Sequence, residues 1–214
     1  MLKVTESEQL NNVHDNKVLG KMPVMNNSSI TFNGENNILF CEDNVTLVNC
    51  NIVFNGNNSV IYLCSSRHAY KLNVTTNHNS SFYVGRNNYF NGVLNAILSE
   101  QKHIFIGDDC LFSFGIWLRV ADPHLVYDVA EKKRRNLSKS IFLGDHIWIG
   151  QSALILKGTH IHSGSIIGAL SVVANKKSLP ILRGQATPQK SLPKVFFGMV
   201  RVFTVGLTNK LLQI

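Results

Sequence analysis

A spacing of six between aliphatic residues constrains this chain more than any other feature. From Leu143 onward, aliphatic side chains recur seven times in succession, at positions 143, 149, 155, 161, 167, 173 and 179. Ile106, Phe112 and Leu118 keep the same spacing upstream. A period of six fits neither an α-helix nor a simple alternating strand. It predicts short strands and turns stacked as the coils of a prism, with one side chain per repeat pointing to the axis.

The N-terminal half repeats more loosely. Residues 30–43 are echoed by residues 52–65, so that Phe32 and Phe54 are 22 positions apart, and residues 82–94 give a third echo. Glycine and asparagine, which enter left-handed backbone conformations at little cost, gather at the expected corners. We therefore predict an all-β stack of parallel coils over residues 27–184. An N-terminal segment, 1–26, precedes it, and a C-terminal packing segment, 185–214, follows it.

One insertion interrupts the register. Leu118 predicts the next inward position at 124, but the register resumes at Leu143, so 19 extra residues form a loop at about 122–140. Long loops on a repeat scaffold are either decoration or the place where function lies. This loop contains a histidine, two aspartates, a tyrosine and a run of four basic residues.

His124 is the first candidate for chemistry in this loop. Histidine titrates near neutral pH, so it can take a proton from a hydroxyl and return it. Asp122 or Asp128 could accept its second ring proton. Trp148 is the second candidate, because its indole N–H could hold a developing oxyanion. The simpler alternatives are a surface histidine and an aromatic side chain packed over a coil corner.

The chain is basic, with 21 Lys and Arg against 13 Asp and Glu and a net charge of +8. Such a balance suits an anionic partner. The charge does not choose among a nucleic acid, a phosphorylated cofactor, a membrane surface and an acidic polysaccharide. No nucleic-acid-binding motif is visible, so we predict no nucleic acid. Most basic runs are solvated surfaces. The residues predicted to bind an acidic substrate are Arg119, Lys132, Lys133, Arg134 and Arg135, and those predicted to grip a phosphorylated cofactor are Lys176 and Lys177.

The cysteines and the two ends of the sequence bear on where the protein is located. The four cysteines show no CxxC spacing and are expected to be reduced and buried. The first residues contain no apolar leader, which predicts a cytoplasmic protein. The apolar stretch 195–214 is interrupted by Arg201 and Lys210, so we expect it to pack on the domain or on another subunit. Peripheral association with the inner face of a membrane is the alternative. No metal-ligand spacing is present, and no metal is predicted.

Together, the sixfold register, the sequence Asp-Pro-His in the loop, the sequence DHIWIG at 145–150 and the sequence GALSVV at 168–173 resemble the hexapeptide-repeat acetyltransferases. The NGxNN corners of the N-terminal half are similar to those of capsular polysaccharide O-acetyltransferases, notably enzymes acting on sialic-acid capsules. The resemblance implies a left-handed β-helix, acetyl-CoA as co-substrate, and a homotrimer with active sites between neighbouring prisms.

The resemblance also implies roles for individual residues. His124 matches the catalytic histidine and Trp148 the tryptophan beside the thioester. Residues matching or neighbouring the turns that meet the pantetheine arm of the cofactor are Gln151, Ala153, Ala169 and Ser171. Leu125 stands where the family usually has proline. Ala174 and Asn175 stand where it often has Thr-Lys, which moves the expected phosphate grip to Lys176 and Lys177.

The function predicted from these residues is transfer of an acetyl group from acetyl-CoA to a sugar hydroxyl of an acidic capsular or surface polysaccharide, with His124 as general base. Two alternatives stay open. One is an N-acetyltransferase acting on an amino sugar. The other is a non-catalytic β-helix that serves as a scaffold or binding protein, because fold alone does not determine function.

Overall fold

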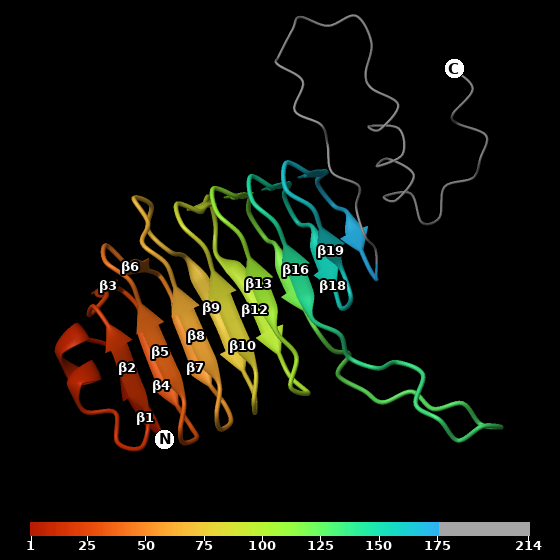
Figure 1. The fold of residues 1–214 in the computed structure, drawn as a ribbon, viewed down its shortest axis with the longest axis horizontal. Helices are drawn as coiled ribbons and strands as arrows, with labels where there is room; N and C mark the ends of the chain where they lie inside the picture. The colour runs from red at the N-terminus through yellow and green to blue at the C-terminus, as the bar shows by residue number, and fades with distance from the viewer. Residues whose placement is uncertain (176–214) are drawn as a thin grey trace, which may run out of the picture.

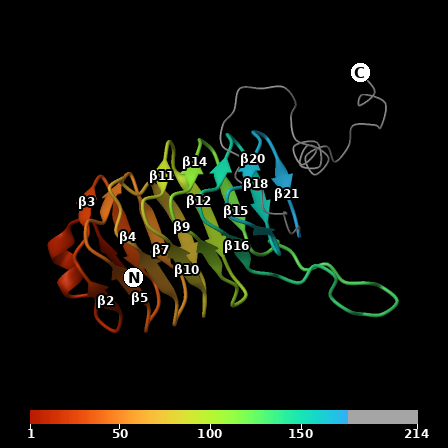
Figure 2. The same ribbon diagram turned by 45° about the horizontal axis from the view of Figure 1, so that its top comes forward.

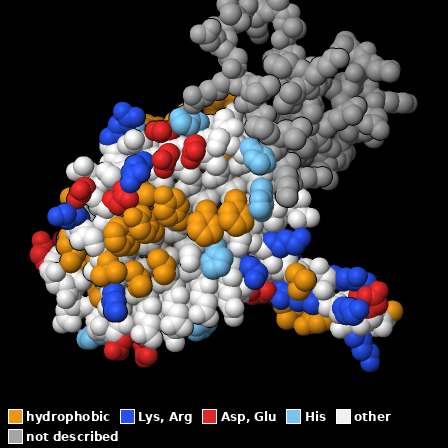
Figure 3. All heavy atoms as spheres, in the orientation of Figure 1, with side chains coloured by type: hydrophobic (Ala, Val, Ile, Leu, Met, Phe, Trp, Pro, Cys, Tyr) orange, Lys and Arg blue, Asp and Glu red, His pale blue; other side chains and the backbone are white. Residues whose placement is uncertain are grey.

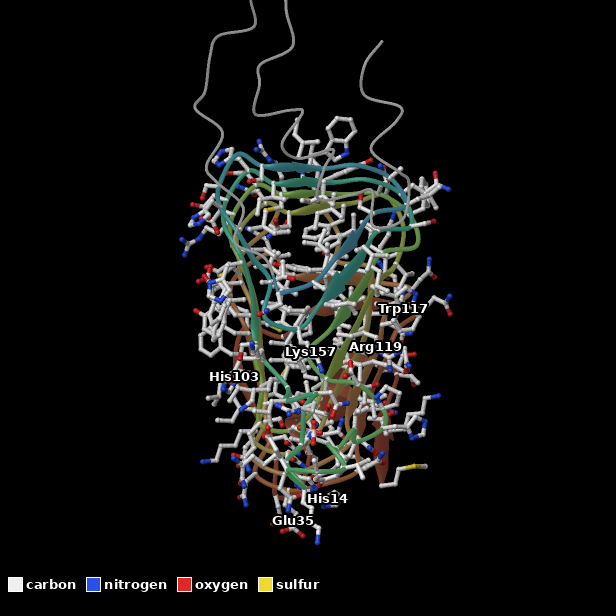
Figure 4. The ribbon with its side chains drawn as sticks, turned by 90° about the vertical axis from the view of Figure 1, so that its right-hand side faces the viewer. His14, Glu35, His103, Trp117, Arg119 and Lys157 are labelled. Atoms are coloured by element: carbon white, nitrogen blue, oxygen red, sulfur yellow. The ribbon has the colours of Figure 1, made fainter. Side chains whose placement is uncertain are left out.

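The computed structural model describes residues 1–175, which form a parallel β-helix of seven coils. Each regular coil contributes strands to the faces of a prism (Figures 1 and 2). In Figure 4 the C-terminal end faces the viewer, with His103 on the left face and Trp117 on the right. The chain runs from left over the top to the right as it advances toward the viewer, so the helix is left-handed, as predicted.

The strands of the first face are β1 (Leu2–Val4), β4 (Ser29–Phe32), β7 (Asn51–Phe54), β9 (Leu72–Thr76), β12 (Leu94–Leu98), β15 (Trp117–Arg119), β18 (Leu154–Leu156) and β21 (Val172–Val173). Those of the second face are β2 (Lys17–Gly20), β5 (Ile38–Cys41), β8 (Val60–Leu63), β10 (Ser81–Val84), β13 (Ile104–Ile106), β16 (Ile141–Leu143) and β19 (His160–Ile161). The third face holds β3 (Val24–Asn26), β6 (Thr46–Val48), β11 (Tyr89–Phe90), β14 (Leu111–Phe112), β17 (Trp148–Ile149) and β20 (Ile166–Ile167).

The N-terminal residues close one end of the stack. Strand β1 pairs antiparallel with β4, and a short 3₁₀ helix, η1 (Ser7–Asn11), follows it. Val4 and Leu10 are buried beneath this cap. Terminal repeats of a solenoid need such a cap, since an open coil would expose its core. The parallel coils already begin at Lys17 in β2, inside the segment 1–26 that the sequence set apart.

The predicted inward positions form the core. Leu143, Ile149, Ile155, Ile161, Ile167 and Val173 are all buried, as are Ile106, Phe112 and Leu118 upstream. In the N-terminal half, Phe32 pairs with Phe54 across adjacent coils, and their rings stack with centroids 4.8 Å apart. Both predicted repeats are therefore confirmed, and position 179 lies outside the described residues.

Coil length changes along the stack. Phe32 and Phe54 are partners at a spacing of 22, whereas Leu154 and Val172 are partners at a spacing of 18, which is three hexapeptides. Trp117 and Leu154 are partners at a spacing of 37, because this coil contains the inserted loop. The strands stay in register throughout, so the extra residues are accommodated at corners.

The corners explain the asparagine content. Residues 1–175 include sixteen non-glycine residues with positive φ, and eight of these are asparagine. Glycine has two separate uses. Gly158 and Gly164 adopt positive φ, whereas a Cβ on Gly107 would lie 2.6 Å from the carbonyl carbon of Gly144 in the next coil. At Gly107, therefore, the close approach of the next coil excludes a side chain, although the backbone conformation there would accept one.

Outward side chains also stack from coil to coil. On the second face, register places Leu19, Phe40, Tyr62, Tyr83, Phe105, Phe142 and His160 in one column. The rings of Phe40 and Tyr62 stack at 4.4 Å, and those of Phe105 and Phe142 at 5.3 Å. This column is the hydrophobic band that crosses the face in Figure 3. On the first face, Asn51 donates to Asn73 and Asn73 to Asn95, at 3.2 and 3.0 Å.

Within residues 1–175, no helix has the length and hydropathy needed to cross a membrane. The predicted C-terminal packing segment, 185–214, lies outside the described residues.

The four cysteines provide a test of the packing. All are free and buried, and burial raises the pKa of Cys41 and of Cys110 to about 12. Since the thiolate is the reactive form, we expect no thiol to react with a disulfide reagent at pH 8 in the native protein. All four should react after denaturation, and three in a Cys50→Ala control. Fast reaction of any thiol without denaturant would contradict this packing.

Candidate active site

The inserted loop leaves the prism at the corner between the first and second faces. It begins after β15 and returns at β16, and it projects away from the coils in Figure 1. Tyr127 and Arg134 form an antiparallel bridge in its outer part. The amide of Asp128 donates to the carbonyl of Lys133 at 2.9 Å, so the loop is an irregular hairpin. Its predicted position and extent are confirmed.

Asn136 holds the neck of the loop together. Its Nδ2 donates to Oδ2 of Asp122 at 2.9 Å and to the carbonyl of His124 at 2.6 Å. Its Oδ1 accepts from the amide of Val126 at 2.8 Å. One side chain therefore bridges the outgoing and returning strands where His124 leaves the prism.

Two ion pairs fasten this neck to neighbouring coils. Lys157, just after β18, donates to Asp122, and this bond holds the pKa of Asp122 below its ordinary value. Arg134 forms a two-pronged pair with Glu100 at 2.7 and 2.9 Å. Ser138 donates to the same carboxylate at 2.7 Å. These bonds, led by that of Arg134, lower the pKa of Glu100, so the carboxylate and its bonds persist until the pH falls through that lowered pKa.

His124 lies in this neck with an exposed side chain. Within residues 1–175 its imidazole has no hydrogen-bond partner. Asp122 is bound to Lys157 and Asn136, while Asp128 accepts from the amides of Ala130 and Glu131 and from Arg135. Which carboxylate orients His124 therefore stays a prediction.

Trp148 lies on β17 of the third face, away from the corner where the loop departs. Its side chain is 51% exposed. Strand register aligns it with three other exposed apolar residues, Tyr89, Leu111 and Ile166, along the face labelled by β11, β14 and β20 in Figure 2. A single chain thus holds His124 and Trp148 on different sides of the prism and does not bring them together.

The residues expected along the cofactor lie beyond Trp148, between the third and first faces. Gln151 and Ala169 are exposed corner residues. Ala153 is only 1% exposed and Ser171 only 3%. The Ser171 hydroxyl donates to the carbonyl of Gly168 at 2.8 Å, so its side chain is used within the coil. Any contact of these two residues with a ligand must come from their backbone. Lys176 and Lys177 lie outside the described residues.

The four basic residues of the loop divide into two pairs. Arg134 is bound to Glu100, and Arg135 is bound to Asp128 at 2.7 Å and to Glu131 at 3.2 Å. Lys132 and Lys133 lie at the exposed tip and have no acidic partner among the residues that the structure describes. Of these four residues, the two tip lysines thus carry charges that no described carboxylate engages, whereas the two arginines are held in ion pairs.

A cavity of about 340 Å³ opens on the first face directly beside the neck. Its lining comes from β15, β18 and the start of the loop, namely Trp117, Arg119, Ala121, Asp122, Pro123, Leu154 and Leu156. Figure 4 places Trp117, Arg119 and Lys157 along this side of the prism. Sequence reasoning named Arg119 but missed Trp117. Trp117 could have been found from its position, because it lies two residues before Arg119 in the same strand and therefore points to the same side.

No protein-family model matches the chain. A polysialic acid O-acetyltransferase of Neisseria meningitidis is 36% identical over 61 residues, covering 28% of both proteins. One of Escherichia coli O1:K1 / APEC is 32% identical over 62 residues, 29% of this chain and 20% of that protein. The galactoside O-acetyltransferase of Escherichia coli (strain K12) is 32% identical over 100 residues, 47% of each. The matches thus span less than half the length of these curated relatives.

Two solved structures share the fold along most of the chain. The polySia specific acetyltransferase NeuO matches with a TM-score of 0.65 and 21% identity, over 88% of this chain and 94% of that one. The polysialic acid O-acetyltransferase OatWY matches with a TM-score of 0.59 and 24% identity, over 78% and 82%.

The chain thus shares a β-helix fold with these two solved structures. The curated proteins to which this chain is similar in sequence are polysialic acid and galactoside O-acetyltransferases, which confirms the resemblance stated from its motifs.

Asn136 offers a test of how the neck is held. In Asn136→Ala, loss of its bonds should loosen the loop, each bond contributing about 0.5–1.5 kcal/mol. We expect trypsin to cleave near Lys132 and Lys133 several-fold faster, while the melting temperature changes little because the core is untouched. Asn55→Ala, which removes two amide ladder bonds on an earlier coil, is the matched control. Equal cleavage of both variants would refute the assigned role.

Proposed function

We propose that this protein is an O-acetyltransferase that moves an acetyl group from acetyl-CoA to a hydroxyl of an acidic polysaccharide. The observation that carries the proposal is sequence similarity to O-acetyltransferases in a chain whose inserted loop carries a histidine. The acidic acceptor is supported by the net charge of +8 and by Lys132 and Lys133 at the loop tip. It is also supported by the names of two relatives, which specify polysialic acid.

His124 acts as the general base in this proposal. Its imidazole takes the proton of the sugar hydroxyl, and the resulting oxygen nucleophile attacks the carbonyl carbon of the thioester. The tetrahedral intermediate places negative charge on the former carbonyl oxygen, which the indole N–H of Trp148 or backbone amides stabilise. Its collapse breaks the carbon–sulfur bond, and the imidazolium returns the proton to the thiolate of CoA. Direct transfer of this kind needs neither a metal ion nor an acyl-enzyme.

We further propose that the active site forms between copies in a homotrimer. Support comes from the separation of the His124 loop and Trp148 on one prism. The exposed apolar column around Trp148 gives a neighbouring copy a surface to cover. Cyclic symmetry then lets the loop of each subunit meet the third face of the next. The cofactor would run past Gln151 and Ala169 toward Lys176 and Lys177. Free, buried thiols support a reducing, cytoplasmic location.

Replacing the base tests the chemistry. General-base help is worth about 10²–10⁴-fold, so His124→Ala should lower kcat by that factor while acetyl-CoA still binds. The measurement is thiol release with polysialic acid and with neutral glycans as acceptors. His68→Ala, on an early coil, is the matched control. If the wild type neither binds acetyl-CoA nor acetylates any glycan, the enzyme assignment fails and the scaffold alternative replaces it.

Mixing two inactive variants tests the shared site. Co-expressed His124→Ala and Trp148→Ala chains should recover activity, because about one quarter of the sites in a randomly assembled cyclic trimer combine both intact residues. Pairing His124→Ala with the double variant should recover nothing. An absence of recovery in the first mixture, with trimers formed, would place both residues in one chain or remove one from the site.

A further inference from the structure

Arg119 is a charged residue without a counterpart. Within residues 1–175 its guanidinium has no hydrogen bond or ion pair, and its Nε is shielded from solvent. Among the other arginines of residues 1–175, Arg86, Arg134 and Arg135 are paired with carboxylates, whereas Arg67 is unpaired and exposed. A buried donor left unsatisfied is costly, particularly on a charged group, so this Nε calls for an explanation.

The surroundings of Arg119 form a cavity suited to one sugar ring. Leu154 and Leu156 of the next coil and Ala121 supply apolar walls. Trp117 is 37% exposed and lies one outward position before Arg119. A volume of about 340 Å³ is at the small end of ligand pockets. Apolar walls with a few convergent polar groups are the usual composition of such sites.

The carboxylate already in this cavity does not neutralise Arg119. Asp122 is held by Lys157 and by Asn136 and makes no bond to the guanidinium. Lys157 and Asp122 form an ion pair whose charges offset each other, so within residues 1–175 the positive charge of Arg119 has no partner. The unpaired guanidinium of Arg119 therefore suits an oxyanion from outside the chain. A planar guanidinium binds a carboxylate through two parallel hydrogen bonds.

We propose that this cavity is the acceptor subsite, in which Arg119 binds the carboxylate of an acidic sugar and Trp117 packs against the apolar face of the sugar ring. The inference rests on the function proposed above and names the group that selects the substrate. Asp122 and Pro123 line the cavity, and His124 follows them directly, so a ring bound here lies next to the base. The phosphates of CoA are the other source of an oxyanion, and the experiment separates the two.

The test compares polysialic acid oligomers with the same oligomers after reduction of their carboxylates to alcohols. In Arg119→Gln, kcat/KM for the acidic oligomer should fall about 10- to 100-fold, as expected for losing a charge-assisted hydrogen-bonded pair. The value for the reduced oligomer should change less than about threefold, and the KM for acetyl-CoA should not change. Trp117→Ala should lower kcat/KM for both oligomers. Arg67→Gln, an exposed arginine on another coil, controls for net charge.

Two results would overturn the subsite. An equal loss on both oligomers would give Arg119 a structural role only, and a raised KM for acetyl-CoA would assign it to the cofactor phosphates. Direct titration of the acidic oligomer into wild type and Arg119→Gln provides a readout that does not need turnover. Binding lost only in the variant supports the subsite even if no acetylation occurs. Absence of binding to the wild type refutes it.

Discussion

The structure depends on the hydrogen-bond ladder between successive coils. Parallel strands about 4.8 Å apart bond only if each coil presents its backbone in step with the last. The pairs Phe32–Phe54, Ile106–Leu143 and Ile155–Val173 keep that step through coils of quite different length. Every other feature follows from this requirement. Inward positions must be apolar, corners must accept left-handed backbone, and extra residues must leave the prism.

The same requirement directs insertions to one corner. Gly34 and Glu35, part of the longer N-terminal turns, and the whole of 120–140 lie between a strand of the first face and the next strand of the second. The 22-residue coils and the 37-residue coil thus differ in how many extra residues they place at this one corner. The candidate active site grows from a corner that was already extended, and the strands on either side remain undisturbed.

Much of the fold could be predicted from sequence, because each hexapeptide places one apolar residue inward and the sixfold spacing of these residues is visible in the sequence. The loop could also be predicted, because the sixfold spacing stops at Leu118 and resumes only at Leu143. The start of the stack at Lys17 was missed because β2 lacks a full hexapeptide signature. Arg134 and Glu100, 34 positions apart, meet only after the coils stack, so no local pattern predicts their pairing. The separation of His124 from Trp148 is likewise a property of the prism.

The tethering of the loop has a consequence for exchanging this loop between similar chains. Two residues outside the loop hold its neck in position. Glu100 lies in the corner before β13, and Lys157 lies in the coil that follows the loop. The unit that defines the loop's shape is therefore discontinuous in sequence. A chimera that grafts only the contiguous segment would carry Arg134 and Asp122 away from their partners. A graft that also carries the two outlying residues would transfer the geometry.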